Sequence, residues 1–419
     1  MIKRILNKWM GGGVVLALLV GAADAQEPQS PNDVSDPPTT LDVFLRTNTN
    51  FFTDQLDFQN RQTDKELFLL RDQARFDGPA VFVGGQARLS AIAGATNTEN
   101  KFNYLGRFPP DFEGKSVTDA RMLQANAALA GHVNDWISVY GELLFSDVFS
   151  FPDHKQGSLQ VRQAYAVFGD LSESPFYGFA GKKNVSFGDM GTLSPFSQSV
   201  VWHYFGALHE GAGIGYDDGD FNFTLSALNG GRGLRVSDSE AKGKLNNFAV
   251  NALYRSDSDW VQWQVGAGFL LGTIYDATEA EHLDPTAFGE YNHAWDVNGE
   301  MRVGPVTVAA EIASTTGDWP TTGHPVIAYR TEAAYDCCVA ECPARLSVSW
   351  SEGIQGASGT EFEFNQQLVL GLSVTPDPHV RLSFEYIRSL GFAPLIGITT
   401  VSDRHVVQNT ALAGMTLVF

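Results

Sequence analysis

The sequence predicts an all-β fold, a transmembrane antiparallel β-barrel of about 16 strands with short periplasmic turns and long extracellular loops. Apolar and polar side chains alternate with a period of two across most of residues 78–419. Short and long connections follow each other in alternation between these segments. The alternation also continues to the last residue, Phe419, in "TALAGMTLVF". We therefore assign residues 78–419 to the barrel.

The first 25 residues are typical of a secretory signal peptide. Lys3, Arg4 and Lys8 precede the apolar run 14–20, and the small-residue motif Ala23-Asp24-Ala25 follows it. Beyond this segment no run approaches the ~20 apolar residues of a membrane helix, so a helical membrane protein is excluded. The net charge of −20 argues against nucleic acid as a partner. Because the chain is predicted to be an exported β-barrel, we expect it in the outer membrane of a Gram-negative bacterium.

Residues 26–77 are predicted to be a periplasmic linker with one possible short helix. The stretch 27–43 is rich in Pro, Ser and Asp, which is typical of a disordered segment. The stretch 51–76 is polar but carries Leu56, Phe58, Leu67 and Leu70 at a spacing too irregular for a coiled coil. Only about 50 residues separate the signal peptide from the first strand, which is too few for an independent plug domain.

Strands with one apolar and one polar face follow from residue 80 onward. In "VRLSFEY" (380–386), Val, Leu, Phe and Tyr share one face, and Arg, Ser and Glu share the other. Short turns are predicted at 133–135, 217–219, 256–258, 304–305 and 376–378, and long connections between them. A barrel that encloses water must turn its apolar face to lipid, because unpaired polar groups are costly in hydrocarbon.

The last strand must then close on the first, which explains the apolar alternation up to Phe419. A terminal aromatic in this phase resembles the C-terminal signature of Gram-negative outer-membrane barrels, which implies the barrel-assembly machinery as a partner through Phe419. Aromatic residues at strand ends favour outward-facing girdles at the two membrane interfaces. These aromatics are Tyr177, Phe221, Tyr254, Trp295, Trp350 and Tyr386.

One longer motif, "GFAGKKNVSFGDMGTLSPFSQSVVWHYFGALHEGAGIGY" (178–216), contains Phe187-Gly188, a loop with Ser194-Pro195 and a return strand. This motif is similar to the LbtU-like family of siderophore porins. The resemblance implies an outer-membrane channel linked to ferric-siderophore uptake, here without a plug domain. It implies no residue-level binding site.

Inward-facing charged residues are the candidate contacts for a solute. Mixed charges in a barrel are commonly solvated or paired, but opposed charges can also orient a polar solute at a constriction. The candidates are Arg88, Glu142, Arg162, Asp296, Glu300, Arg302, Glu311, Arg330, Glu332, Arg381 and Glu385. The loop 185–208 is too apolar to lie bare in water, so we expect it to fold inward and narrow the lumen through Trp202, His203 and Tyr204.

Three cysteines lie in "DCCVAEC". In an oxidising compartment Cys342 could bond to Cys338 or to Cys337 and staple a turn. No His lies nearby to complete a zinc site, so neither a metal nor a cofactor is expected.

The sequence favours a porin-type channel for small solutes and no enzymatic activity, since no nucleophile elbow or zincin motif occurs. Ferric siderophore is the solute that the resemblance implies. The alternatives are a general or carbohydrate-selective diffusion porin, a surface adhesin or structural barrel, and an outer-membrane lipid hydrolase.

Overall fold

The computed structural model describes residues 45–73, 79–103, 112–146, 158–229, 245–258, 260–276, 290–360, 362, 365–391 and 403–419. Residues 43–419 form one compact unit. The predicted signal peptide, 1–25, and the first part of the predicted linker, 26–44, lie outside the described residues.

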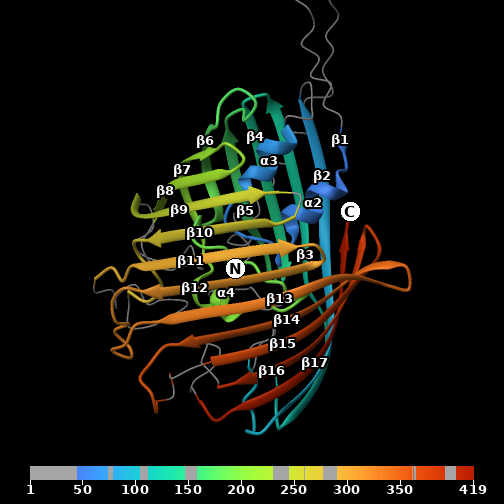
Figure 1. The fold of residues 1–419 in the computed structure, drawn as a ribbon, viewed down its shortest axis with the longest axis vertical. Helices are drawn as coiled ribbons and strands as arrows, with labels where there is room; N and C mark the ends of the chain where they lie inside the picture. The colour runs from blue at the N-terminus through green and yellow to red at the C-terminus, as the bar shows by residue number, and fades with distance from the viewer. Residues whose placement is uncertain are drawn as a thin grey trace, which may run out of the picture. The chain divides into compact units, whose positions relative to one another are not determined.

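The described residues form a single sheet in which sixteen long strands pair consecutively and antiparallel, from β2 to β17, and β17 pairs with β2 to close the barrel. Figure 1 shows these strands in chain order from blue to red. They are β2 (Ala80–Thr96), β3 (Ser116–Asn134), β4 (Ile137–Ser146), β5 (Ser158–Phe168), β6 (Phe176–Asn184), β7 (Leu208–Asp217), β8 (Phe221–Asn229), β9 (Leu245–Asp257), β10 (Gln262–Leu270), β11 (Ala294–Val303), β12 (Val306–Thr315), β13 (Ile327–Val339), β14 (Cys342–Ile354), β15 (Asn365–Asp377), β16 (Val380–Leu390) and β17 (Val407–Val418). The predicted fold class is confirmed.

The seam of the barrel joins the two ends of the sheet. Phe419 and Gly85 exchange two backbone hydrogen bonds of 3.1 and 3.0 Å. β17 has no residues left to pair with the part of β2 that precedes Gly85. There the short strand β1 (Leu45–Arg46) pairs in parallel with Val81 and Phe82 of β2. Pairing at both positions leaves less of the β2 edge without a backbone partner.

Short and long connections separate as the sequence predicts. The longest connection of the short set, 169–175, is shorter than the shortest of the long set, 355–364. Two short turns, 169–175 and 340–341, were not predicted. Ala340 and Glu341 both have positive φ, 49° and 67°, in a turn that lacks the Gly or Asn usually found there.

The two faces of the strands also follow the predicted phase. On β17, Ala411 and Ala413 are exposed while Thr410 and Leu412 are buried. Phe221, Tyr254, Trp295 and Tyr386 are exposed on the outer face. Tyr177 was placed on that face and is an exception, because its hydroxyl accepts a 3.1 Å hydrogen bond from Asn222 inside the barrel. Its neighbour Phe176 takes the outward position.

Residues 45–73 form two helices, α2 (Thr49–Leu56) and α3 (Glu66–Gln73), instead of one. Their apolar side chains pack on inward residues of the barrel wall, so this segment lies against the inner face of the strands. The cluster contains Phe51, Phe52, Leu56, Leu67, Leu69 and Leu70 with Phe82, Tyr140, Tyr165, Tyr177 and Phe179. Among the described residues, no helix is long and apolar enough to cross a membrane.

Gly84 of β2 allows α2 to approach the wall. A Cβ at this position would lie 2.2 Å from Cδ2 of Phe52 and 2.6 Å from the carbonyl oxygen of Phe419. We predict that Gly84→Ala loosens α2, and that hydrogen exchange over 49–56 becomes faster than in the wild type. Gly141→Ala is the control, because a Cβ at Gly141 meets nothing within 4 Å. Unchanged exchange in Gly84→Ala would contradict this packing.

Candidate functional site

The connection between β6 and β7, residues 185–207, turns into the barrel. Its backbone amides donate to carboxylates of inward residues on three strands. Asp189 and Met190 donate to Oε1 of Glu311 at 2.8 and 3.0 Å. Leu193 donates to Glu332 at 2.9 Å. The infolding predicted from the apolar sequence of this loop is therefore seen in the structure.

A third carboxylate holds the far side of the loop. Phe196 and Ser197 donate their amides to Oε1 of Glu385 on β16, at 2.8 and 3.0 Å. Charge-assisted hydrogen bonds of this kind are about twice as strong as neutral ones. The inner loop, residues 185–207, is thus fixed to β12, β13 and β16.

Arg330 on β13 joins two of these carboxylates, those of Glu311 and Glu332. Its guanidinium donates to Glu311 and to Asp189, both at 2.7 Å, and it also pairs with Glu332. Arg330 is 1% exposed. Four predicted solute contacts, Arg330, Glu311, Glu332 and Glu385, therefore anchor the loop. These side chains bind the loop because a buried charge needs a partner.

The three residues chosen for a constriction, Trp202, His203 and Tyr204, lie in the helix α4 (Val200–Phe205) of this loop. The side chain of Ser199 caps the helix by accepting from the amide of Trp202 at 3.3 Å. Tyr204 is buried in an apolar cluster with Val200, Val201 and Phe205, and Trp202 packs against its edge. Tyr204 and Trp202 thus fix the helix to the wall.

The inner loop and the N-terminal segment are hydrogen-bonded to each other inside the barrel. The amide of Gln62 donates to the carbonyl of Asp189 at 3.0 Å, and the amide of Thr192 donates to the carbonyl of Gln59 at 2.8 Å. The hydroxyl of Thr63 donates to the carbonyl of Gly188 at 2.7 Å. We call residues 57–66 and 188–198 together the inner partition.

Charged side chains and one histidine tie the N-terminal segment to strands on different sides of the barrel. These pairs are Asp57 with Arg381 of β16 at 2.8 Å, Asp64 with Arg255 of β9 at 2.8 Å, Glu66 with Lys183 of β6 at 2.9 Å and Asp72 with His132 of β3 at 3.3 Å. Because the four strands are spread round the sheet, residues 57–72 cross the lumen.

Two more predicted residues, Arg162 and Arg88, contact the partition, and a third, Glu142, lies beside Arg162 on the wall. The guanidinium carbon of Arg162 lies 4.2 Å from the centre of the Phe58 ring. Arg88 donates to the carbonyl of Phe196 at 2.8 Å. Glu142 accepts from Gln163 at 3.1 Å and lies 3.7 Å from Arg162.

Asp296 of β11 is also covered. It is 1% exposed. It accepts from Nδ2 of Asn298 at 2.6 Å, and a Cβ on Gly188 of the inner loop would lie 2.9 Å from its carboxyl carbon. Asp296 therefore packs against the partition in the structure.

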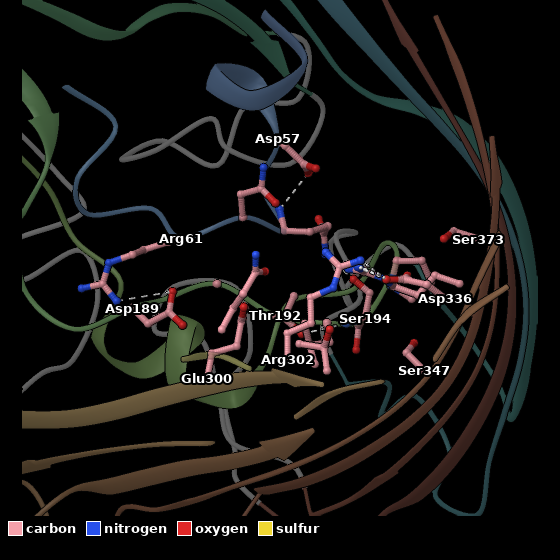
Figure 2. Close-up of a pocket in the computed structure, with 18 of the residues that line it drawn as sticks. Asp57, Arg61, Asp189, Thr192, Ser194, Glu300, Arg302, Asp336, Ser347 and Ser373 are labelled. Carbon is pink, nitrogen blue, oxygen red and sulfur yellow. Dashed lines mark hydrogen bonds and ion pairs between the residues drawn. The ribbon is translucent and has the colours of Figure 1, made fainter. Parts of the chain in front are cut away.

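A polar cavity of about 720 Å³ lies between the partition and the wall. Figure 2 shows Asp57 and Arg61 reaching it from the N-terminal segment, Asp189, Thr192 and Ser194 from the inner loop, and Ser347 and Ser373 from the strands opposite. The remaining predicted residues, Glu300, Arg302 and Arg381, line this cavity.

The cavity exists because several inward residues of neighbouring strands are small. Thr307 of β12, Ser347 of β14 and Ser373 of β15 line it. Gly371 lies beside Ser347, and a Cβ there would meet Cδ of Pro195 at 2.4 Å, so the loop sits directly on this backbone. Larger side chains at these positions would fill the space.

Four charged wall residues of the cavity were missed in the sequence: Arg255, Asp257, Asp336 and Arg345. Each lies near the end of its strand beside a short turn. Asp336 keeps the phase of Arg330 and Glu332, so the alternation along β13 could have found it.

The sequence likewise predicts a linker for the N-terminal segment, whereas residues 45–73 form two packed helices. The sequence feature that could have indicated packed helices is the density of apolar residues between Phe51 and Leu70, which is high for a linker exposed to water.

The three cysteines are free thiols in the structure. Cys342 pairs across the turn with Val339, and Cys338 pairs with Pro343. Side chains alternate between faces along a strand, so Cys338 and Cys342 point to opposite faces, and Cys337 is only diagonal to Cys342. This register explains why the expected Cys338–Cys342 bridge is not present. Within the described ranges no group of three or more His, Cys, Asp or Glu side chains could hold a metal ion.

No protein-family model and no curated protein matches this sequence. Solved structures do resemble it. The outer membrane channel DcaP of Acinetobacter baumannii is 15% identical with a TM-score of 0.51, over 82% of this chain and 98% of that one. Pseudomonas putida OprB is 10% identical with a TM-score of 0.53, over 87% and 100%. An anion-selective porin from Comamonas acidovorans is 10% identical with a TM-score of 0.51, over 81% and 100%.

At these identities the likeness establishes the fold, a closed 16-strand antiparallel barrel of the kind found in outer-membrane porins. The LbtU-like family is not among the matches described.

The anchoring of the inner loop can be tested at Glu385. In Glu385→Gln the negative charge is lost, and the one remaining oxygen can accept only neutral hydrogen bonds from the amides of Phe196 and Ser197. We predict that hydrogen exchange of these amides becomes faster by about tenfold, because hydrogen bonds to a charged group contribute about 1.5–3 kcal/mol and neutral ones about 0.5–1.5 kcal/mol. The control is Glu352→Gln, since Glu352 accepts only from Tyr329 among the hydrogen bonds seen here. Equal protection in both variants would refute the anchoring role.

Proposed function

We propose that this chain is a porin-type channel of the Gram-negative outer membrane for small polar solutes, and that residues 45–73 close it at rest. The observation that carries the proposal is the inner partition, in which the N-terminal segment and the inner loop are hydrogen-bonded to each other across the barrel. A barrel with only a structural role has no need of a polar cavity beside such a partition.

The chemistry of the partition supports a movable closure. Many of its links are hydrogen bonds and ion pairs, which water can replace when the segment leaves. The apolar side chains of α2 and α3 favour the docked state, since exposing them costs about 25 cal/mol per Å². Such a balance lets the segment be held firmly and still be released.

Location and assembly belong to the same proposal. The predicted signal peptide supports export, and the apolar outer face suits a lipid environment. The terminal Phe419, exposed beside the seam, suits recognition by the barrel-assembly machinery. Residues 26–44 would then remain on the periplasmic side with the short turns.

Opening of the channel can be tested by weakening the anchors of the segment. In Asp57→Asn/Asp64→Asn the carboxylates that pair with Arg381 and Arg255 are lost. In planar bilayers we predict that the double variant opens more often than the wild type and with the same unit conductance, because the wall is unchanged.

The matched control is Asp220→Asn/Glu341→Gln, which also removes two negative charges but from exposed turns. Its open fraction should equal that of the wild type. If neither the wild type nor the anchor variant ever conducts, the channel proposal fails, and an adhesin or structural barrel becomes the better explanation.

The closed state should depend on pH through Lys65. Its ammonium donates to the carbonyls of Gln55 and Asp57 at 2.8 and 2.6 Å. Burial lowers the pKa of Lys65 from 10.5 to about 8, and nearby Asp57 opposes this only in part. The docked segment thus binds the proton more weakly than the released segment does.

Raising the pH from about 7 to about 10 should therefore favour docking and reduce the open fraction. Lys65→Gln should lose most of this dependence, and single-channel recording over that pH range provides the measurement. An open fraction that rises with pH in the wild type would be the opposite of the expected sign.

Ferric siderophore is the finer proposal for the solute, and it is supported by the resemblance of residues 178–216 alone. Liposome swelling with the anchor variant separates it from the alternatives. Faster entry of ferric siderophores than of sugars of equal size favours uptake of iron. Entry ordered by size alone favours a general diffusion porin, and preference for sugars favours a carbohydrate-selective one. Release of fatty acid from the liposomes would indicate the lipid hydrolase.

A further inference from the structure

We infer that Arg302 and Arg345 form an anion-binding subsite in the cavity, and that it takes small solutes bearing carboxylates. This inference deepens the proposed function by assigning a class of solute to the cavity. It begins from a group of three side chains on β11, β13 and β14, in which two guanidiniums share one carboxylate. Figure 2 shows Arg302 and Asp336 among the residues that line the cavity.

Asp336 of β13 lies between the two arginines. Arg345 of β14 holds it with two hydrogen bonds, Nε to Oδ1 at 2.6 Å and Nη2 to Oδ2 at 3.1 Å. Arg302 of β11 donates from Nη2 to the same Oδ2 at 3.1 Å. The three side chains carry two positive charges and one negative charge at neutral pH, since arginine does not lose its proton, and Glu300 carries a further negative charge on the same face of β11.

In the other arginines of the cavity, the guanidinium is paired with carboxylates or is largely buried. Arg330 is bound by three carboxylates, and its side chain is 1% exposed. Arg61 donates to Asn298 and Gly188 and lies near Asp64 and Asp189. By contrast, the side chains of Arg302 and Arg345 are 47% and 38% exposed. The side chains of Arg255 and Arg381 are 22% and 29% exposed and pair with carboxylates of the N-terminal segment. Arg302 and Arg345 are therefore the most exposed guanidiniums of the cavity.

The geometry suits a carboxylate. A guanidinium presents five donors, so each of these arginines keeps N–H groups beyond those used on Asp336 and Gly304. Planar forks of this kind bind carboxylates with two parallel hydrogen bonds. The hydroxyls of Thr307, Ser347 and Ser373 line the same cavity and can bind the hydroxyl groups of the solute.

Glu300 limits which anions fit. It lies two residues from Arg302 on the same inward face of β11, and no ion pair to it is seen among the described residues. Its charge repels a second carboxylate placed there and attracts a hydroxyl or an ammonium. The expected solute therefore carries its carboxylates at Arg302 and Arg345 and a hydroxyl group toward Glu300, an arrangement that citrate can make.

Equilibrium dialysis of the detergent-solubilised full chain with radiolabelled citrate tests the subsite without any need for conduction. We expect Arg302→Gln/Arg345→Gln to weaken citrate binding by about tenfold or more, as the loss of charge-assisted hydrogen bonds requires. Lys115→Gln/Arg388→Gln is the matched control. It removes two positive charges that do not line the cavity, and its affinity should stay at the wild-type value.

A second variant distinguishes binding from a merely structural role. Asp336→Asn removes the carboxylate that occupies both forks, so citrate should bind more tightly than in the wild type if the arginines bind the solute. If the group only stabilises the wall, the affinity should fall or stay unchanged, which would overturn the inference. Equal citrate affinity in the wild type and in Arg302→Gln/Arg345→Gln would also overturn it.

Inorganic phosphate is the comparator, because guanidiniums bind it by the same fork. Competition by phosphate at lower concentration than by other carboxylates would replace the proposed class with phosphate. The dialysis outcome is independent of the channel proposal. A protein that binds citrate through Arg302 and Arg345 but never conducts in bilayers keeps this subsite and loses only the channel function.

Discussion

The requirement that every buried charge inside a closed barrel finds a partner shapes this interior. Glu311, Glu332 and Glu385 point inward because their strands alternate, and they cannot stay unpaired away from water. The backbone amides of the inner loop face the same problem, since a loop inside a barrel loses its hydrogen bonds to solvent. Each set satisfies the other, and Arg330 pairs in addition with Glu311 and Glu332. The inner loop therefore depends on carboxylates from distant strands.

The same logic extends to the N-terminal segment. Its carboxylates at Asp57, Asp64 and Glu66 meet Arg381, Arg255 and Lys183 of the wall. A buried pair contributes little net stability, but breaking it by removing one partner is costly. These pairs therefore fix where the segment docks more than how tightly it docks. The tightness comes from the apolar side chains of α2 and α3, which pack on inward aromatics of β2, β4, β5 and β6.

The barrel could be predicted from the sequence because its signal is local. The period of two in segments such as 380–386 fixes both the strand and its inward face, and the phase counted back from Phe419 agrees with the burial of Thr410 and Thr416. The interior could not be predicted in the same way. Whether Glu385 faces water or the amide of Phe196 depends on a contact between residues 189 positions apart. The apolar residues of 51–70 were visible, but nothing local indicates that their partners are barrel strands.

The partition and the cavity are coupled through charge. While the segment is docked, Asp57 neutralises Arg381, which lines the cavity, and Asp64 neutralises Arg255. Release of the segment removes both carboxylates. Arg255 keeps Asp217 of β7 as a partner at 3.2 Å, whereas Arg381 is left facing the cavity that Arg302 and Arg345 also line. An anionic solute that reaches Arg381 would compete with Asp57 for its guanidinium, so binding of such a solute favours the released state.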